Sequence, residues 1–337
     1  MGAEYARTLL HLGVAPERVT VLGRRREAVE AFAERFGGMR PLSGGLDALD
    51  GLPAHAAAIV AVPPVLLAEA ARRVIAGGTP SLLLEKPGAL SAEELAEVAE
   101  AARRAGCGAS LALNRRFFPS VRKTRELIAE DGGLLAASVD FSELECRILQ
   151  DPVTLSWGPE ALARWGLVNS CHVIDLFIHL AGRPTDWRPQ RGGALPWHPS
   201  GAIFWGSGTT DRGTAFSYLS TWNAAGRWGL EVTTPRRKIL LRPLEAPSVQ
   251  TRDGFALVPL AVPVEAADLK PGFPGMVKAF LLGGAEAAVL CSIDEAVATL
   301  QVAETIFGYA PGDPDPWRTQ GTVNYDLGSR LPPRSQN

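Results

Sequence analysis

The segment Ser81-Leu82-Leu83-Leu84-Glu85-Lys86-Pro87 decides the fold, because an apolar strand ends there in a carboxylate, an amine and a proline ring. Open α/β sheets bind their ligands just beyond the carboxyl ends of parallel strands. Pro87 stops the strand, so Lys86 is expected to face that crevice. A charge at a strand end is often only solvated. The functional interpretation of Lys86 therefore depends on the segments around it.

Length and composition limit the class of protein. The 337 residues fit two domains, each large enough to bury a core. The 34 basic and 36 acidic residues nearly cancel, which argues against nucleic acid or a membrane surface as the main partner. No apolar run approaches the roughly 20 residues that span a bilayer. The four cysteines form no C-x-x-C pair, which suits a reducing cytoplasm and predicts neither disulfides nor a metal site.

Strands and helices alternate in the N-terminal third of the chain. The predicted strands are 19–22, 56–62, 82–84 and 108–113. The segments between them have apolar residues at helical spacing. This alternation is typical of βαβ units and a parallel, doubly wound sheet. We expect a dinucleotide-binding Rossmann domain at 1–118.

The first unit of this pattern is incomplete, because the sequence begins with a helix. A dinucleotide-binding fold starts with a strand, a G-x-G-x-x-G turn and a helix whose N-terminus binds the pyrophosphate. Met1 and Gly2 stand where the last two positions of that turn would be. We expect that the first strand and most of the glycine loop are missing, that Gly2 remains in the cofactor site, and that cofactor binding and stability are weak.

The pattern changes after about residue 120. Strands are predicted at 134–144, 214–222, 228–233, 238–241 and 255–260, and helices near 120–130, 160–181, 273–283 and 292–307. Consecutive strands on short turns indicate a largely antiparallel sheet. We predict a second, α+β domain with an open sheet at 119–337, for substrate binding and oligomerisation.

Two segments of the first domain are candidates for cofactor binding. Gly23-Arg24-Arg25-Arg26 follows the second Rossmann strand, where an acidic residue would bind the ribose of NAD. Arginine instead fits a 2′-phosphate, so we predict that Gly23, Arg24 and Arg25 bind NADP, with NAD as second choice. A solvated basic helix start is the alternative, although cations oppose the helix dipole there. Val62-Pro63-Pro64 is a stiff turn that would lie under the nicotinamide ribose.

A histidine in the second domain is the candidate acid/base. His172 begins a helix and shares one face of it with Asp175 and His179. There is no H-E-x-x-H motif, so a metal site is not predicted. His172 is either a satisfied core residue or an acid/base, to which its unperturbed pKa of about 6.5 is suited. We predict that His172 takes the proton of a hydroxyl group whose oxygen Lys86 polarises.

These motifs, in this order, resemble the Gfo/Idh/MocA family of NAD(P)-dependent oxidoreductases. The motifs are Glu85-Lys86-Pro87, the turn Ala61-Val62-Pro63-Pro64, Asn114-Arg115-Arg116-Phe117 and the helix with His172-Val173-Ile174-Asp175. The resemblance extends to about residue 310. It implies hydride transfer to or from a hydroxyl or keto carbon of a sugar, cyclitol or sugar derivative. Lys86 would bind the reacting oxygen and His172 would relay the proton.

The resemblance also implies further binding residues and an oligomer formed through the open sheet. The cofactor is expected to contact Glu85, Lys86, Asn114 and Arg116. The substrate is expected to contact Lys86, Arg116, Arg147, Trp165, Asn169, His172 and Trp205. The tryptophans would equally fit the core of the second domain.

The sequence departs from the family at one catalytic position. Many members have an Asp four residues before the histidine, where this chain has Val168. The next residue, Asn169, cannot exchange a proton, so the relay would rest on Lys86 and His172. A second hypothesis therefore stays open: a catalytically inactive, dinucleotide-binding regulatory or scaffold protein of the same fold.

Overall fold

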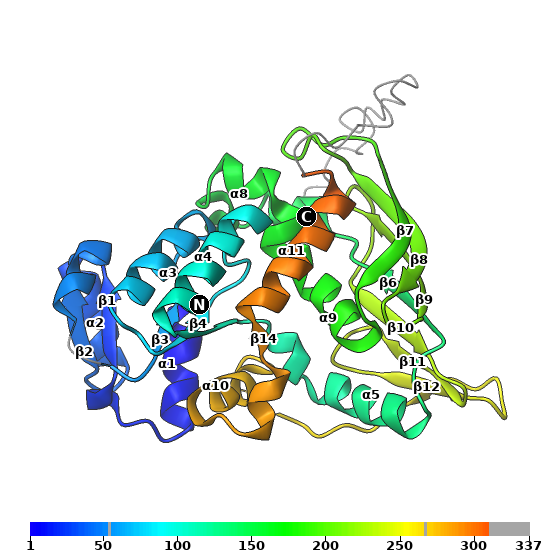
Figure 1. The fold of residues 1–337 in the computed structure, drawn as a ribbon, viewed down its shortest axis with the longest axis horizontal. Helices are drawn as coiled ribbons and strands as arrows, with labels where there is room; N and C mark the ends of the chain where they lie inside the picture. Colours follow the sequence, from blue (N-terminus) through cyan, green and yellow to red (C-terminus); the bar gives the residue numbers. More distant parts are fainter. Residues whose placement is uncertain (53–54, 266–267, 310–337) are drawn as a thin grey trace, which may run out of the picture.

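The structure, a computed structural model, describes residues 1–52, 55–265 and 268–309. Figure 1 shows an N-terminal part, in which short parallel strands alternate with helices, and a C-terminal part built on one large sheet. The large sheet has eight strands and is antiparallel except at one pair. This arrangement confirms the predicted fold class. The domain boundary near residue 118 stays a prediction.

The N-terminal strands form two separate sheets. β1 (Thr20–Gly23) pairs in parallel with β2 (Arg40–Ser43). The second sheet has the order β14-β5-β4-β3. Its strands are β3 (Ala58–Val60), β4 (Ser81–Leu84), β5 (Gly108–Leu111) and β14 (Cys291–Ser292), which joins β5 antiparallel. Among the described residues no strand joins β1 to β3, the place of the first strand in a Rossmann sheet.

The strand β4 has helices on both faces. The N-terminal helices are α1 (Gly2–His11), α2 (Arg26–Arg35), α3 (Leu67–Ala76) and α4 (Ala92–Ala105). Leu82 and Leu84 pack in a cluster with α3 and α4, whereas Leu83 packs in another cluster with α1. All three leucines are completely buried. Burial on both faces explains why β4 reads as an unbroken apolar run.

The C-terminal sheet has the strand order β13-β12-β11-β10-β6-β9-β8-β7. Its strands are β6 (Ala136–Asp140), β7 (Pro184–Gly192), β8 (Ile203–Thr210), β9 (Ala215–Thr221), β10 (Gly229–Thr233), β11 (Arg237–Leu241), β12 (Ser248–Thr251) and β13 (Val258–Pro259). β6 pairs in parallel with β9. The sequence analysis missed β7, β8 and β12, and it predicted the last strand too long. Prolines in β7 and glycines in β8 hide the alternating pattern that identifies a strand.

The predicted C-terminal helices are present, with one interruption. They are α5 (Pro119–Glu130), α9 (Cys171–Ala181), α10 (Phe273–Leu282) and α11 (Ile293–Phe307), with the short α6 (Glu145–Ile148), α7 (Pro152–Leu155) and α8 (Pro159–Ala163). The helix predicted over 160–181 is instead α8, a π-helical turn η5 (Gly166–Ser170) and α9. The 3₁₀ turns are η1 (Pro16–Arg18), η2 (Gly45–Gly51), η3 (Pro64–Leu66), η4 (Asn114–Phe117) and η6 (Ala285–Val289). Within the described ranges, no helix is long and apolar enough to cross a bilayer.

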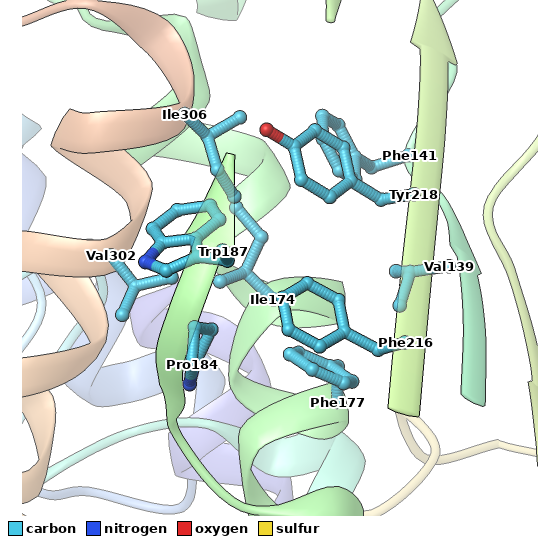
Figure 2. A pocket seen from close by; sticks show the side chains of 10 residues that line it. All are labelled: Val139, Phe141, Ile174, Phe177, Pro184, Trp187, Phe216, Tyr218, Val302 and Ile306. Carbon is cyan, nitrogen blue, oxygen red and sulfur yellow. The ribbon is translucent and has the colours of Figure 1, made fainter. Parts of the chain in front are cut away.

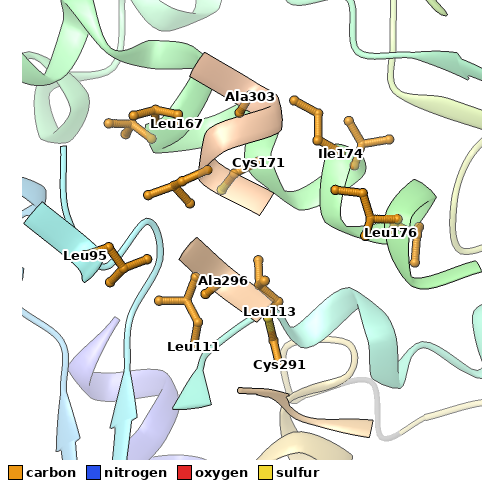
Figure 3. Close-up of a cluster of buried hydrophobic side chains, with 14 of the residues drawn as sticks. Leu95, Leu111, Leu113, Leu167, Cys171, Ile174, Leu176, Cys291, Ala296 and Ala303 are labelled. Carbon is orange, nitrogen blue, oxygen red and sulfur yellow. The ribbon is translucent and has the colours of Figure 1, made fainter. Parts of the chain in front are cut away.

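Helix α11 joins the two parts in one core. Figure 1 shows α11 passing between α4 and α9 at the centre of the molecule. In Figure 3, Ala296 and Ala303 of α11 lie among side chains of both parts, such as Leu111 of β5 and Ile174 of α9. Small alanine side chains let these elements approach closely. The site described below is therefore held between two parts that share a packed interior.

A small pocket lies between α9, α11 and the large sheet (Figure 2). It is lined by Val139, Phe141, Ile174, Phe177, Pro184, Trp187, Phe216, Tyr218, Val302 and Ile306. These side chains are nearly all apolar, and none of them carries an acid or a base. The pocket is therefore part of the core rather than a catalytic site.

Candidate functional site

Lys86 lies immediately after β4, at the junction of the two parts. Its Nζ atom donates a hydrogen bond to the carbonyl oxygen of Val168 in η5, over 2.6 Å. Burial lowers the pKa of Lys86, whereas the negative charge of Glu85 raises it. A π-helical turn is uncommon and frequently marks a functional site. The amine is thus held by a backbone carbonyl, and its other two N–H groups have no hydrogen-bond partner among the described residues.

Glu85 points into the N-terminal part. Its carboxylate is 5% exposed and accepts a hydrogen bond from the hydroxyl of Tyr5 in α1, at 2.7 Å. Burial, together with the charge of Glu85, holds the pKa of Tyr5 well above its usual range. Glu85 therefore fixes α1 against the end of β4, next to the place where the cofactor is expected.

His172 lies in the first turn of α9 and is 6% exposed. Among the described residues its Nδ1 has no hydrogen-bond partner. Burial holds the pKa of His172 well below its usual range, and the positive charges of Arg115 and Lys86 lower it further. The imidazole is therefore neutral at neutral pH. A neutral ring with an unpartnered nitrogen can accept a proton from a ligand.

Arg115, which the sequence analysis did not select, reaches the same site from η4. Its guanidinium carbon lies 4.6 Å from the ring centre of Trp228, and that ring centre lies 6.1 Å from the ring of His172. Burial lowers the pKa of Arg115 to about 10, so the group stays charged at neutral pH. The cation rests on an aromatic face instead of pairing with a carboxylate.

Arg116 lies elsewhere, which corrects its expected place at the cofactor and substrate. Its guanidinium forms a buried ion pair with Asp175 of α9, with a shortest distance of 2.7 Å. A second carboxylate, that of Glu295 in α11, lies 3.4 Å away. The pair joins η4 to the two central helices. We therefore place Arg115, not Arg116, in the candidate site.

Glu143 is a second residue that the sequence analysis missed. It follows β6, and its Oε1 accepts hydrogen bonds from Asn169 Nδ2 (2.9 Å), Ser170 Oγ (3.0 Å) and Trp228 Nε1 (3.1 Å). Burial raises the pKa of Glu143 to about 7, although these hydrogen bonds oppose the shift. Its negative charge in turn raises the pKa of Lys86. A carboxyl group that exchanges a proton at neutral pH thus lies near Lys86, in a chain that has no Asp at position 168.

Lys270 brings a third cation to the site. It lies in the loop before α10, and its positive charge lowers the pKa of His172. Burial lowers the pKa of Lys270 itself, and the positive charges of Lys86 and Arg115 lower it further. Asn114 holds this loop, because its Nδ2 donates to the carbonyl oxygen of Pro271 at 2.8 Å. The next residue, Gly272, has φ +75°, and a Cβ there would lie 2.2 Å from the carbonyl oxygen of Asn114. Asn114, expected at the cofactor, therefore positions Lys270.

The other predicted substrate residues divide between core and site. Trp165 is 5% exposed and packs edge-on against Trp197, with ring centres 6.4 Å apart. Asn169 is bound to Glu143 at the edge of the site. Trp205 lies in β8 and Arg147 lies in α6. Asn169 thus reaches the site through its hydrogen bond to Glu143.

Several residues predicted to bind the cofactor lie at the carboxyl ends of parallel strands in the N-terminal part. Val60 of β3 is paired with Leu84 of β4, so the turn with Val62, Pro63 and Pro64 lies beside Glu85 and Lys86. The N-terminus of α1, at Gly2, has no side-chain cap, so its first N–H groups can bind an anion.

The carboxyl end of β1, at Gly23, also belongs to a pair of parallel strands. Arg24 and Arg25 are exposed there, and neither forms an ion pair within the part of the chain that the structure describes. Gly23 is required because a Cβ would lie 2.5 Å from Val29. These features fit a dinucleotide.

Comparisons with known proteins agree with the fold. The model of the oxidoreductase family with an NAD-binding Rossmann fold (GFO_IDH_MocA) matches residues 1–113. No curated protein sequence matches the chain. Levoglucosan dehydrogenase, solved with NADH and levoglucosan, is 19% identical with a TM-score of 0.72, over 92% of this chain and 93% of that one.

Two further structures are similar. UDP-N-acetylglucosamine 3-dehydrogenase GnnA from Acidithiobacillus ferrooxidans is 16% identical with a TM-score of 0.69, over 90% of this chain and 92% of that one. An oxidoreductase from Thermotoga maritima is 17% identical with a TM-score of 0.71, over 91% and 93%. At these identities the structural likeness shows the fold. With the family match over residues 1–113, it confirms the resemblance found in the sequence: the N-terminal part is similar to the Gfo/Idh/MocA oxidoreductases with their NAD-binding Rossmann fold, and the chain as a whole has the fold of these solved structures.

Proposed function

We propose that the protein transfers a hydride between a nicotinamide cofactor and a hydroxyl or keto carbon of a sugar, cyclitol or sugar derivative. The observation that carries this proposal is that Lys86, which follows β4, lies close enough to His172 for its charge to lower the pKa of that histidine. One is a cation with free donors, and the other is a neutral base with an unpartnered Nδ1. Oxidation of a carbinol needs both a group that polarises the oxygen and a group that takes its proton.

Each residue has a defined part in this reaction. Lys86 donates a hydrogen bond to the reacting oxygen, and the carbonyl of Val168 orients the amine. His172 accepts the hydroxyl proton in oxidation and returns it in reduction. Glu143 takes up or releases a proton at neutral pH because its pKa is raised to about 7. The alternative of an inactive, dinucleotide-binding regulatory protein is not favoured. It was raised by the missing Asp at position 168, and His172 and Glu143 can exchange protons in place of that Asp.

The cofactor in this proposal is NADP, with NAD as the second choice. Gly2 at the start of α1 would bind the pyrophosphate, and Gly23, Arg24 and Arg25 the 2′-phosphate. The turn Val62-Pro63-Pro64, with Glu85 and Lys86, would lie at the nicotinamide ribose. When bound, the nicotinamide supplies or accepts the hydride. The free guanidinium groups at the end of β1 support NADP, because arginine matches a phosphate better than a ribose hydroxyl.

The substrate class rests on the similar structures and on the site. Levoglucosan dehydrogenase and UDP-N-acetylglucosamine 3-dehydrogenase are named for sugar substrates. In this chain, Trp228 presents an aromatic face beside Arg115 and His172, and such faces suit sugar rings.

The assembly and location are also proposed. The outer face of the large sheet has Leu219 57% exposed, and we propose that a second copy covers this face in a homo-oligomer. Cys107, Cys171 and Cys291 are buried free thiols, which supports a cytoplasmic protein.

A panel of sugars and cyclitols with NADP⁺ and NAD⁺, read by the absorbance of the reduced cofactor, tests the proposal. Turnover that Lys86→Ala abolishes supports it. Lys123→Ala is the matched control, because Lys123 pairs with Glu126 on the surface of α5 at 2.9 Å. Cofactor binding without turnover of any compound would instead support the regulatory protein.

A further inference from the structure

We infer that the substrate carries an anionic group, a carboxylate or a phosphate, and that Arg115 binds it. This inference rests on the proposed function and names the substrate class of the same site. It comes from the surroundings of Arg115, which differ from those of the other enclosed arginines.

Two other enclosed arginines of the described structure are paired with carboxylates. Arg116 pairs with Asp175 at 2.7 Å, and Arg237 pairs with Asp131 at 2.8 Å. Arg115 forms no ion pair with any described residue, and its Nε is buried without a hydrogen-bond partner. A buried charge that lacks a partner is costly. An anionic ligand group would supply the missing partner.

The nearby charges favour the same ligand. Lys86 and Lys270 lie close enough to lower the pKa of His172 together with Arg115. Three acids lie near these cations. Glu85 accepts a hydrogen bond from the hydroxyl of Tyr5, Oε1 of Glu143 already accepts three hydrogen bonds, and Glu245 is paired with Arg227 at 3.7 Å. In the described structure none of these carboxylates is hydrogen-bonded to one of the three cations, so the cations can accept an anionic ligand group as their partner.

The position of Arg115 separates its ligand from the cofactor phosphates. Its guanidinium lies over Trp228, which belongs to the C-terminal part, whereas the phosphates are expected at α1 and β1. The same Trp228 ring also lies near His172, with ring centres 6.1 Å apart. A polyol with an acidic group a few carbons from its reacting hydroxyl would reach Arg115 and His172 together. The planar fork of the guanidinium suits two parallel hydrogen bonds to a carboxylate or phosphate.

The test compares matched neutral and anionic substrates. Hexoses, the corresponding hexuronates and hexose phosphates are assayed with both cofactors, using wild type, Arg115→Met, Arg115→Lys and Arg122→Met. We expect kcat/KM of the best anionic compound to exceed that of its neutral counterpart by roughly 10- to 100-fold, the range for a charged hydrogen-bonded pair. Arg115→Met should remove this preference, and Arg115→Lys should keep part of it. Arg122→Met is the control, because Arg122 also lies over an aromatic ring, that of Phe117 at 5.4 Å, but outside the site.

The outcomes distinguish this inference from the proposed function. If neutral sugars are turned over as well as anionic ones, or if Arg115→Met lowers kcat/KM equally for both, the inference is wrong and the proposed function stands. If no compound is turned over, the proposed function fails, and calorimetric titration with hexuronate and with hexose phosphate decides the inference. Binding to wild type that Arg115→Met abolishes supports it, and absence of binding overturns it.

Discussion

The amine of Lys86 donates a hydrogen bond to the backbone carbonyl of Val168, over 2.6 Å. Position 168 is the one at which the family resemblance implies an Asp in many members. Here the backbone orients the lysine, and the side chain of Val168 is completely buried in the core. The orientation of Lys86 therefore needs no carboxylate at this position.

This contact predicts that the side chain of Val168 matters for stability and not for turnover. Val168→Ala should lower the free energy of unfolding by roughly 1–3 kcal/mol, because it leaves a cavity in the core. It should keep kcat, since the carbonyl is unchanged. Urea unfolding and steady-state kinetics check both. Val173→Ala, at another fully buried position in α9, is the control, and a loss of turnover specific to Val168→Ala would contradict the prediction.

The raised pKa of Glu143 predicts a pH-dependent stability. Below about pH 4.5 the carboxyl is protonated in both the folded and the unfolded chain. Between 4.5 and about 7 the unfolded chain releases the proton while the folded protein keeps it. Wild type should therefore lose roughly 3 kcal/mol of stability relative to Glu143→Gln as the pH rises through this interval, with no further change above it.

Urea unfolding of both proteins at pH 5 and pH 8 measures this difference. Glutamine keeps an oxygen that can accept the bonds from Asn169, Ser170 and Trp228, so the comparison isolates the proton. A difference that does not change with pH would show that Glu143 is ionised throughout.

His172 is predicted to be needed for turnover but not for cofactor binding. His172→Asn should lower kcat roughly 10²- to 10⁴-fold, the usual contribution of a general base. Its pKa lies well below the usual range, so any change of rate near pH 7 should come from Glu143 and disappear in Glu143→Gln. His179→Asn, further along α9, is the control. Unchanged turnover in His172→Asn would make His172 a core residue.

The main elements were predictable where the sequence carries a repeating physical pattern. The run Leu82–Leu84 is buried on both faces of β4, and a strand in that setting must be apolar throughout. The strands β7 and β8 were missed because prolines in the edge strand β7 and glycines in its neighbour β8 interrupt their alternation. Their pairing is decided by partners far along the chain, which no local pattern records.

The site was predictable only in part, because contacts between segments far apart in the chain leave no local pattern in the sequence. Lys86 and His172 stand in recognisable motifs, whereas Glu143 and Lys270 come from separate segments without one. Arg115 stands in the motif Asn114-Arg115-Arg116-Phe117, in which its neighbour Arg116 was selected instead. Arg115 and Arg116 are adjacent and chemically identical. In the 3₁₀ turn η4, Arg115 lies over Trp228 and Arg116 pairs with Asp175. Their different roles follow from the tertiary structure and not from the local sequence.

The exposed arginines after β1 predict the choice of cofactor. Arg24→Ala/Arg25→Ala should raise KM for NADPH roughly 10- to 100-fold, because charged hydrogen bonds to the 2′-phosphate are lost, and should leave KM for NADH nearly unchanged. Arg26→Ala is the control, since Arg26 pairs with Glu30 at 2.7 Å. A wild-type preference for NADH would contradict the assignment of NADP.

The buried ion pair of Arg116 and Asp175 predicts a large, non-additive loss of stability. Arg116→Met leaves the Asp175 carboxylate enclosed without its partner, and Asp175→Leu does the same to the guanidinium, so each should cost about 3–5 kcal/mol. The double variant removes both charges and should cost clearly less than the sum. Glu295→Gln is the control, because Glu295 is mostly exposed and 3.4 Å from Arg116, so it should cost at most about 1 kcal/mol. Additive losses in urea unfolding would show that the two side chains stabilise the junction of η4 and α9 independently.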